Sequence, residues 1–172
     1  MPGHTPQTYL FVPGNRPERF AKALASDADR IVIDLEDAVA PADKAGARAS
    51  RAEWLASAPE AREKVLIRIN DEATPWHMED LVLIRAVQAV CVMLPKCEAS
   101  SQVSAVLAHL ANNATVLALI ETARGMLALP VIAATPGVAR LAFGSLDYMV
   151  DLDIPADGVA LDYAASQIAI AS

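Results

Sequence analysis

Six short runs of Val, Ile and Leu recur along the chain, and longer stretches rich in alanine separate them. The runs are continuously apolar, which is typical of strands that are buried on both faces of a parallel sheet. The stretches between them, such as residues 17–26, 42–58, 77–88 and 100–111, are long enough for helices. Alternation of strand and helix predicts an α/β fold with a parallel sheet. The expected strands are Thr8–Val12, Arg30–Leu35, Val65–Ile69, Val90–Leu94, Thr115–Ile120 and Val138–Phe143.

Polar residues gather at the end of each expected strand, and in a parallel sheet those strand ends share one edge. Both a (β/α)8 barrel and a doubly wound open sheet place their sites at that edge. No GxGxxG pattern follows the first strand, which makes a dinucleotide-binding sheet the weaker alternative.

The number of units is lower than a complete barrel requires. A closed barrel has eight units and roughly 250 residues, whereas these 172 residues hold six, with residues 156–172 as the sixth helix. We therefore expect one domain over residues 1–172 that is an incomplete TIM (β/α)8-type barrel, truncated at its C-terminal end. Two units supplied from elsewhere, or a sheet that stays open, are the alternatives. Exposed strand edges would promote aggregation unless another chain covers them.

The charge of the chain disfavours one class of partner. The formal net charge is −7, which argues against nucleic acid because phosphate backbones require an excess of Lys and Arg. The first 70 residues hold ten of the 14 basic residues, so a polyanionic ligand would prefer them, although a solvated helix face explains the same charges. The N-terminus lacks the features of a signal peptide, and prolines and Glu121 interrupt the later apolar runs. We expect a soluble cytoplasmic protein that has no membrane span.

Two carboxylates, Glu121 and Asp147, follow the fifth and sixth expected strands. Adjacent strands lie about 5 Å apart, so these side chains can converge on one cation. Two carboxylates, with water and substrate in the remaining positions, form a common Mg²⁺ arrangement. The alternative is local, with Glu121 at the N-terminus of a helix over residues 121–130 and Asp147 capping a turn over residues 144–149. Zinc is not expected, because the histidines are scattered and Cys91 and Cys97 form no CxxC pair.

Arg68 lies at the end of the third expected strand, where a guanidinium can hold a substrate carboxylate through two parallel hydrogen bonds. The structural alternative is an ion pair with Glu36 or Asp37. These two residues and Asp34 place three acids at the end of the second strand. Three ionised carboxylates so close together need a cation or a basic partner.

Six segments, in this order and spacing, resemble the citrate lyase beta subunit and its relatives in the HpcH/HpaI aldolase family, which include malyl-CoA and citramalyl-CoA lyases. The segments are YLFVPGNRPERFAKAL, IVIDLEDAVAPADKAGAR, IRIN, VMLPK, ETARG and FGSLD. The resemblance implies a TIM-barrel enzyme that uses Mg²⁺ to cleave or form a carbon–carbon bond between a 2-oxo acid and an acyl-CoA enolate. An acyl-carrier thioester is the alternative to acyl-CoA, and the implied assembly is a homo-oligomer.

The matching segments also imply roles for single residues. Glu121 and Asp147 become the metal ligands, and Arg68 becomes the clamp for the carboxylate of the 2-oxo acid. Glu36 and Asp37 match acids near the water shell of the metal. The reaction also needs a general base, which the matching segments do not identify; Asp37, acting directly or through a metal-bound water, is the candidate. The basic residues assigned to the CoA phosphates, or to pairing with the acids of residues 34–37, are Arg16, Lys44 and Arg48.

The chain departs from the family pattern at three positions, where relatives commonly carry an acid, a glycine and an arginine. These positions are Leu146, Asp153 and Ala165. Two other functions therefore stay open. A CoA-independent metal-dependent 2-oxo acid aldolase would keep the metal carboxylates without needing the basic N-terminal segment. A catalytically inactive assembly partner would keep only the oligomer contacts, and Mg²⁺ would not raise its thermal stability.

Overall fold

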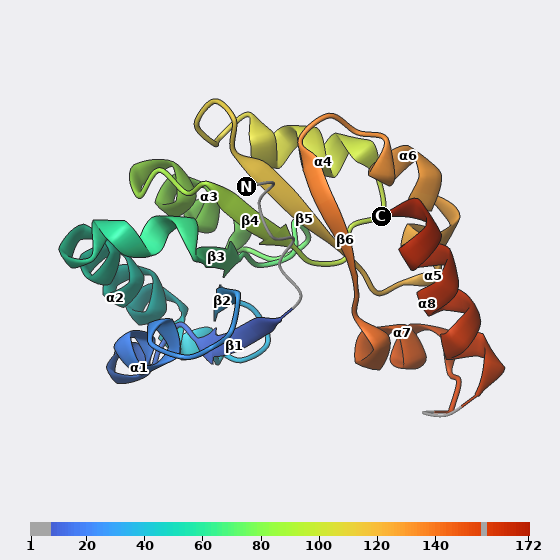
Figure 1. The fold of residues 1–172 in the computed structure, drawn as a ribbon, viewed down its shortest axis with the longest axis horizontal. Helices are drawn as coiled ribbons and strands as arrows, with labels where there is room; N and C mark the ends of the chain where they lie inside the picture. The colour runs from blue at the N-terminus through green and yellow to red at the C-terminus, as the bar shows by residue number, and fades with distance from the viewer. Residues whose placement is uncertain (1–7, 156–157) are drawn as a thin grey trace.

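The computed structural model describes residues 8–155 and 158–172. Six strands lie in one sheet in the order β1-β2-β3-β4-β5-β6, and each neighbouring pair is parallel (Figure 1). The strands are β1 (Tyr9–Pro13), β2 (Arg30–Asp34), β3 (Val65–Arg68), β4 (Cys91–Leu94), β5 (Thr115–Ile120) and β6 (Val138–Phe143). The six strands predicted from the apolar runs are confirmed, and each boundary lies within one residue of its expected position.

The sheet is curved but does not close. Within the described residues β1 pairs only with β2 and β6 only with β5, while the helices lie around the outside of the sheet (Figure 1). The predicted fold class, an incomplete α/β barrel of six βα units, is therefore confirmed.

Eight α-helices occur in the described residues. They are α1 (Phe20–Leu24), α2 (Lys44–Ser57), α3 (His77–Ala86), α4 (Ser100–Leu107), α5 (Ala123–Leu127), α6 (Leu129–Ala133), α7 (Ser145–Leu152) and α8 (Val159–Ala171). Short 3-10 turns at Pro17–Arg19, Pro41–Asp43 and Pro59–Glu63 precede α1, α2 and β3. Across the described ranges, none of the helices has the length and apolar character needed to cross a membrane.

Two helical predictions need correction. The single helix expected over residues 121–130 is two short helices, because Pro130 has no backbone N–H to continue the hydrogen-bond ladder of α5. The segment 144–149, expected as a turn, opens the eight-residue helix α7, and Asp147 lies in its first turn.

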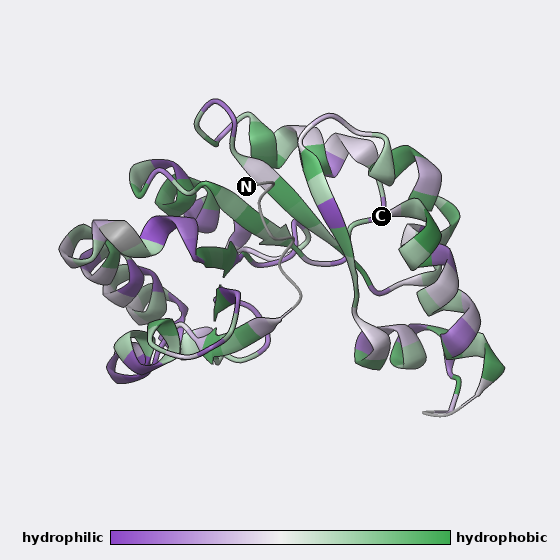
Figure 2. Ribbon diagram, viewed as in Figure 1, coloured by the Kyte–Doolittle hydropathy of each residue, from purple (hydrophilic) through white to green (hydrophobic). Residues whose placement is uncertain are grey.

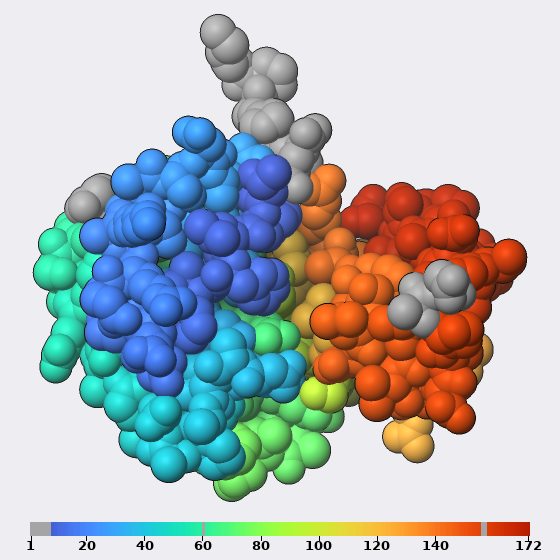
Figure 3. Space-filling model, turned by 90° about the horizontal axis from the view of Figure 1, so that it is seen from below, coloured from blue at the N-terminus to red at the C-terminus, as the bar shows by residue number. Residues whose placement is uncertain are grey.

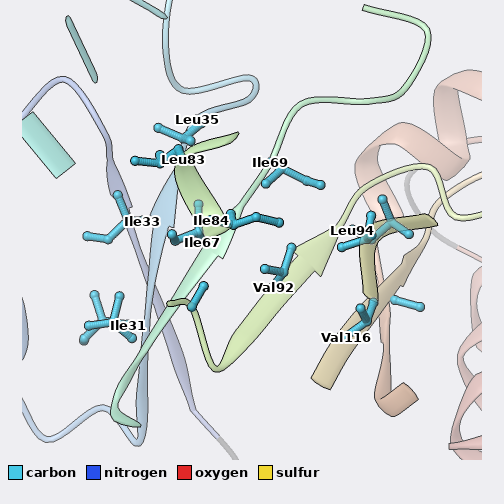
Figure 4. Close-up of a cluster of buried hydrophobic side chains, with 14 of the residues drawn as sticks. Ile31, Ile33, Leu35, Ile67, Ile69, Leu83, Ile84, Val92, Leu94 and Val116 are labelled. Carbon is cyan, nitrogen blue, oxygen red and sulfur yellow. The ribbon is translucent and has the colours of Figure 1, made fainter. Parts of the chain in front are cut away.

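The main core lies between the outer face of the sheet and the helices. Figure 4 shows side chains of this cluster, among them Ile31 and Ile33 of β2, Ile67 of β3 and Val92 of β4. Alternate residues point to the other face, where Val32, Leu66, Met93, Leu117 and Leu119 form a smaller cluster. Both faces of the central strands are therefore apolar, in agreement with the hydrophobic colouring of the strands in Figure 2.

Candidate active site

Arg68 and Asp34 form a bidentate pair at the carboxyl ends of β2 and β3. The strand register places the two residues side by side, as the last residues of their strands. Arg68 donates from Nε to Oδ1 of Asp34 at 2.8 Å and from Nη2 to Oδ2 at 2.6 Å. Asp34 also accepts hydrogen bonds from the backbone N–H groups of Glu36 and Ala38, at 2.8 and 3.1 Å. The guanidinium is therefore held in one orientation by a carboxylate that is itself fixed.

The third nitrogen of Arg68 faces two other acids. Nη1 lies 2.9 Å from Oε2 of Glu36 and 3.5 Å from Oδ2 of Asp37. Burial would lower the pKa of Arg68, but the hydrogen bonds and charge of Asp34, together with Glu36 and Asp37, raise it. The ion-pair alternative for Arg68 is thus present in the structure, and its strongest partner is Asp34, which sequence reasoning did not assign to it.

Glu121 follows β5 directly and is 2% exposed. Its Oε1 accepts a hydrogen bond from the backbone N–H of Lys96 at 2.8 Å. Burial raises the pKa of Glu121 to about 7, and the nearby charges of Glu36 and Asp147 add to this effect, while the Lys96 N–H opposes it. Burial is also the main cause of a raised pKa at Glu36. Both carboxylates therefore lie where ionisation is costly without a cation.

Gly144 leaves the space that the Glu121 side chain occupies. A Cβ atom at position 144 would contact Oε2 of Glu121 and would lie 2.6 Å from its Cβ. The N–H of Gly144 donates to the carbonyl of Ile120 at 2.9 Å, so the backbone itself is held against the end of β5. The absence of a side chain at position 144 is therefore a requirement of this carboxylate, which the sequence pattern alone did not reveal.

Glu121 and Asp147 line one cavity of about 340 Å³, together with Asp37, Lys96, Thr122, Val150 and Asp151. In the space-filling view, the N-terminal segments and the segment of α7 lie on either side of a hollow (Figure 3). No group of three His, Cys, Asp or Glu side chains in the described ranges is arranged to hold a metal ion. A cation here would take two carboxylates from the chain and its other oxygen ligands from water or substrate, which fits Mg²⁺.

Lys96 brings the acids of three strand ends together. Its Nζ lies 3.2 Å from Oε1 of Glu36 and 3.7 Å from Oδ2 of Asp147. Burial would lower the pKa of Lys96, but the charges of Glu36, Glu121 and Asp147 outweigh it and raise the pKa. Lys96 is the last residue of the VMLPK segment, and sequence reasoning assigned it no role. Only the fold reveals that this lysine contacts acids 60 and 51 residues away in the chain.

Comparison with known proteins identifies the family of this chain. The sequence matches the HpcH/HpaI aldolase/citrate lyase family over residues 7–172. The chain belongs to this family.

Two curated relatives of the family align with most of this chain. A citrate lyase subunit beta-like protein of Mycobacterium tuberculosis is 40% identical over 144 residues, which are 84% of this chain and 49% of the relative. A (3S)-malyl-CoA thioesterase of Cereibacter sphaeroides is 33% identical over 149 residues, which are 87% of this chain and 52% of the relative. The chain thus spans about half the length of the curated relatives that it matches.

Solved structures of the family share the fold. The M. tuberculosis protein CitE, in complex with magnesium, acetoacetate and coenzyme A, superposes with a TM-score of 0.84 at 34% identity. The match covers 97% of this chain and 62% of CitE. The citrate lyase beta subunit of the same organism, with oxaloacetate and magnesium, gives a TM-score of 0.81 at 36% identity, over 95% of this chain and 72% of that one.

The basic residues that the family resemblance pointed to are used in different ways. Lys44 is buried, and its Nζ donates to the carbonyls of Leu35 and Glu36 at 2.6 and 2.7 Å and to Oδ1 of Asn70 at 2.6 Å. Burial lowers the pKa of Lys44. The three donors of the Lys44 ammonium are therefore used within the chain, by two backbone carbonyls of residues 34–37 and by the side chain of Asn70. The guanidinium of Arg48 is ion-paired with Glu79 and Asp80, whereas Arg16 is exposed.

Proposed function

We propose that the chain carries the metal-binding half-site of a Mg²⁺-dependent carbon–carbon lyase, which cleaves a 3-hydroxyacyl-CoA to a 2-oxo acid and an acyl-CoA. The observation that supports this proposal most strongly is the convergence of Glu121 and Asp147 on one cavity, at the carboxyl ends of β5 and β6. One solved relative holds magnesium with oxaloacetate, a 2-oxo acid of the class that the proposed reaction releases, and another holds magnesium with acetoacetate and coenzyme A.

The reaction requires charge to move in one direction. The substrate hydroxyl loses its proton, the bond between C2 and C3 breaks, and C3 becomes the carbonyl carbon of the 2-oxo acid. The electron pair passes to the thioester as an enolate, which takes up a proton at C2 to give the acyl-CoA. A bound Mg²⁺ would supply Lewis acidity to the oxygen atoms that carry the developing charge.

Each residue of the site has a part in this proposal. Glu121 and Asp147 hold the metal. Asp34 already occupies Nε and Nη2 of Arg68. The carboxylate of the oxo acid would therefore be oriented by Nη1, in exchange for the contacts of this nitrogen with Glu36 and Asp37. Asp37 lines the cavity with an exposed side chain and is the proposed base for the hydroxyl proton.

The proposal is tested by incubating the chain and Mg²⁺ with citryl-CoA, malyl-CoA or citramalyl-CoA. The release of the 2-oxo acid measures the rate of cleavage. Asp147→Asn should lower the rate by about 100-fold or more, because the variant removes one charged ligand. Asp162→Asn, a matched change on the exposed side of α8, should leave the rate unchanged. The proposal fails if none of the three thioesters is cleaved, or if Asp147→Asn is as active as the unaltered chain.

A CoA-independent 2-oxo acid aldolase is the second candidate, and one observation favours it. Lys44 and Arg48 are both engaged within the chain, which leaves fewer basic groups for the phosphates of CoA. Calorimetric titration with free CoA separates the two candidates. Binding that weakens in Arg16→Ala supports the thioester lyase, and absence of binding, together with aldol cleavage of a free 4-hydroxy-2-oxo acid, supports the aldolase.

A further inference from the structure

Lys96 touches acids from three different strand ends and is the only described residue whose charged group meets both Glu36 and Asp147. Its backbone N–H donates to Oε1 of Glu121 at 2.8 Å, and its Nζ lies 3.2 Å from Glu36 and 3.7 Å from Asp147. Two of these acids, Glu121 and Asp147, are the proposed metal ligands. The backbone and the ammonium of one residue therefore contact the site in two separate ways.

The backbone contact is built into the chain. Lys96 has φ of +44°, a conformation that residues other than glycine rarely adopt. The next residue, Cys97, is buried and donates its N–H to the carbonyl of Leu119 at 3.1 Å, which fastens this turn to β5. The N–H of Lys96 is thus aimed at Glu121 by the fold and leaves Oε2 of that carboxylate for another partner.

The ammonium contact is of a different kind. The side chain is 35% exposed, lines the cavity and hangs on a flexible four-carbon stem, so that it can move without any change of the backbone. Its distance of 3.7 Å from Asp147 is that of an ion pair, not of a fixed hydrogen bond. A divalent cation between Glu121 and Asp147 would repel an ammonium held this close.

We propose that Lys96 is a built-in placeholder for the divalent cation: its ammonium compensates Glu36 and Asp147 in the metal-free protein and is displaced when the metal binds, while its N–H keeps Glu121 oriented in both states. This inference rests on the proposed metal site. In this proposal Lys96 is a positioning residue that affects the affinity for the metal. Metal binding must break the ion pairs of the ammonium with Glu36 and Asp147, and the free energy of that step weakens the binding.

The experiment is a calorimetric Mg²⁺ titration of the unaltered chain and of Lys96→Met, with thermal unfolding of each protein in chelator and in saturating Mg²⁺. Removal of the competing charge should tighten Mg²⁺ binding by about tenfold. In chelator, Lys96→Met should unfold at a lower temperature than the unaltered chain, and Mg²⁺ should raise its midpoint by more. Lys96→Arg, which keeps the charge, should bind Mg²⁺ as the unaltered chain does.

The controls distinguish a failure of the placeholder role of Lys96 from a failure of the proposed metal site. Lys22→Met removes an exposed lysine of α1 and should change neither affinity nor midpoint. Lys96→Gln, whose amide can still bond to Glu36, tests the same charge effect if the Met variant folds poorly. Equal or weaker Mg²⁺ binding by the neutral variants, when the unaltered chain binds, overturns the placeholder role alone. No Mg²⁺ binding by the unaltered chain overturns the proposed metal site and the placeholder with it.

Discussion

Gly144 determines whether the Glu121 carboxylate can face the cavity. Gly144→Ala would place a methyl group 2.6 Å from Cβ of Glu121, so that the glutamate has to leave its position. We expect a loss of about 1–3 kcal/mol in the free energy of unfolding and a loss of Mg²⁺ binding, measured by urea denaturation and calorimetry. Gly46→Ala is the matched control, because nothing lies within 4 Å of a Cβ there. Normal Mg²⁺ binding by the Gly144→Ala variant would contradict the assignment of Glu121 as a metal ligand.

The raised pKa of Glu121 predicts a pH dependence of stability in metal-free buffer. The folded protein holds a proton at Glu121 up to a pKa of about 7, whereas the ordinary pKa is 4.5, so stability falls as pH rises between these values. Glu121→Gln lacks this titration. The variant should match the unaltered chain at pH 4 and exceed its free energy of unfolding by up to about 3 kcal/mol at pH 8.

Urea denaturation across this pH range measures the difference. Glu53→Gln, a change at an exposed position of α2, supplies the control and should show no such divergence. A difference between Glu121→Gln and the unaltered chain that stays constant from pH 4 to pH 8 would show that burial does not hold the proton on Glu121.

The sequence predicted some side chains of the candidate site, and it did not reveal others for a physical reason. Glu121, Asp147 and Arg68 stand out because charge after an apolar strand is unusual, and the structure places all three at the expected edge of the sheet. Asp34 and Lys96 did not stand out as partners, because their contacts depend on strand register and on a backbone turn with positive φ. Neither property can be read from spacing along the chain.

Thr122 connects β5 to helix α5 and caps that helix. Its Oγ1 accepts from the N–H of Gly125 at 3.1 Å and donates to Oε1 of Glu98 at 2.8 Å. Thr122→Val keeps the shape but removes both bonds, and we expect a loss of about 1–2 kcal/mol in the free energy of unfolding. Thr122→Ser keeps the hydroxyl and should lose less. Equal urea midpoints for the Val and Ser variants would contradict the capping role.

Strands were predicted more accurately than helices, and the reason lies in what ends each element. The strands stop where an apolar run meets a charged, proline or glycine residue, as at Ile120 before Glu121. The helices α5 and α6 were expected as one, because their composition is uniformly helix-forming and the break depends on Pro130 alone. The start of α7 was expected as a turn because Gly144 and Ser145 are common turn residues.

The open sheet predicts that the chain associates with itself. Strands β1 and β6 each have one paired edge within the described residues, and Leu10 and Phe11 of β1 are 40% and 45% exposed. Unpaired edges with apolar side chains pair readily with other strands. Sedimentation velocity should therefore show species larger than a monomer whose share grows with protein concentration at micromolar levels.

A charge on the edge should reverse this association. Leu10→Lys is expected to shift the distribution toward monomer, whereas Leu127→Lys, at an 86% exposed position of α5, should leave it unchanged. A monomer at every concentration, or an effect of Leu127→Lys in place of Leu10→Lys, would show that association does not use the sheet edge.

The architecture as a whole was predictable from the sequence, because the repeated strand and helix units and six matching segments point to the same barrel. The order of the strands, their parallel pairing and the open form of the sheet agree with that expectation. The contacts between Lys96 and the acids at the carboxyl edge of the sheet were not predictable. These residues come from four separate βα units and lie close together only after the units have packed.

The proposed metal site can be tested by a crystal structure of the chain with Mn²⁺, which scatters anomalously and takes the same oxygen ligands as Mg²⁺. We predict a single anomalous peak in the cavity, about 2.0–2.3 Å from a carboxylate oxygen of both Glu121 and Asp147, with the Lys96 ammonium moved away from Asp147. An empty cavity at saturating Mn²⁺, or a peak bound elsewhere on the chain, would contradict it.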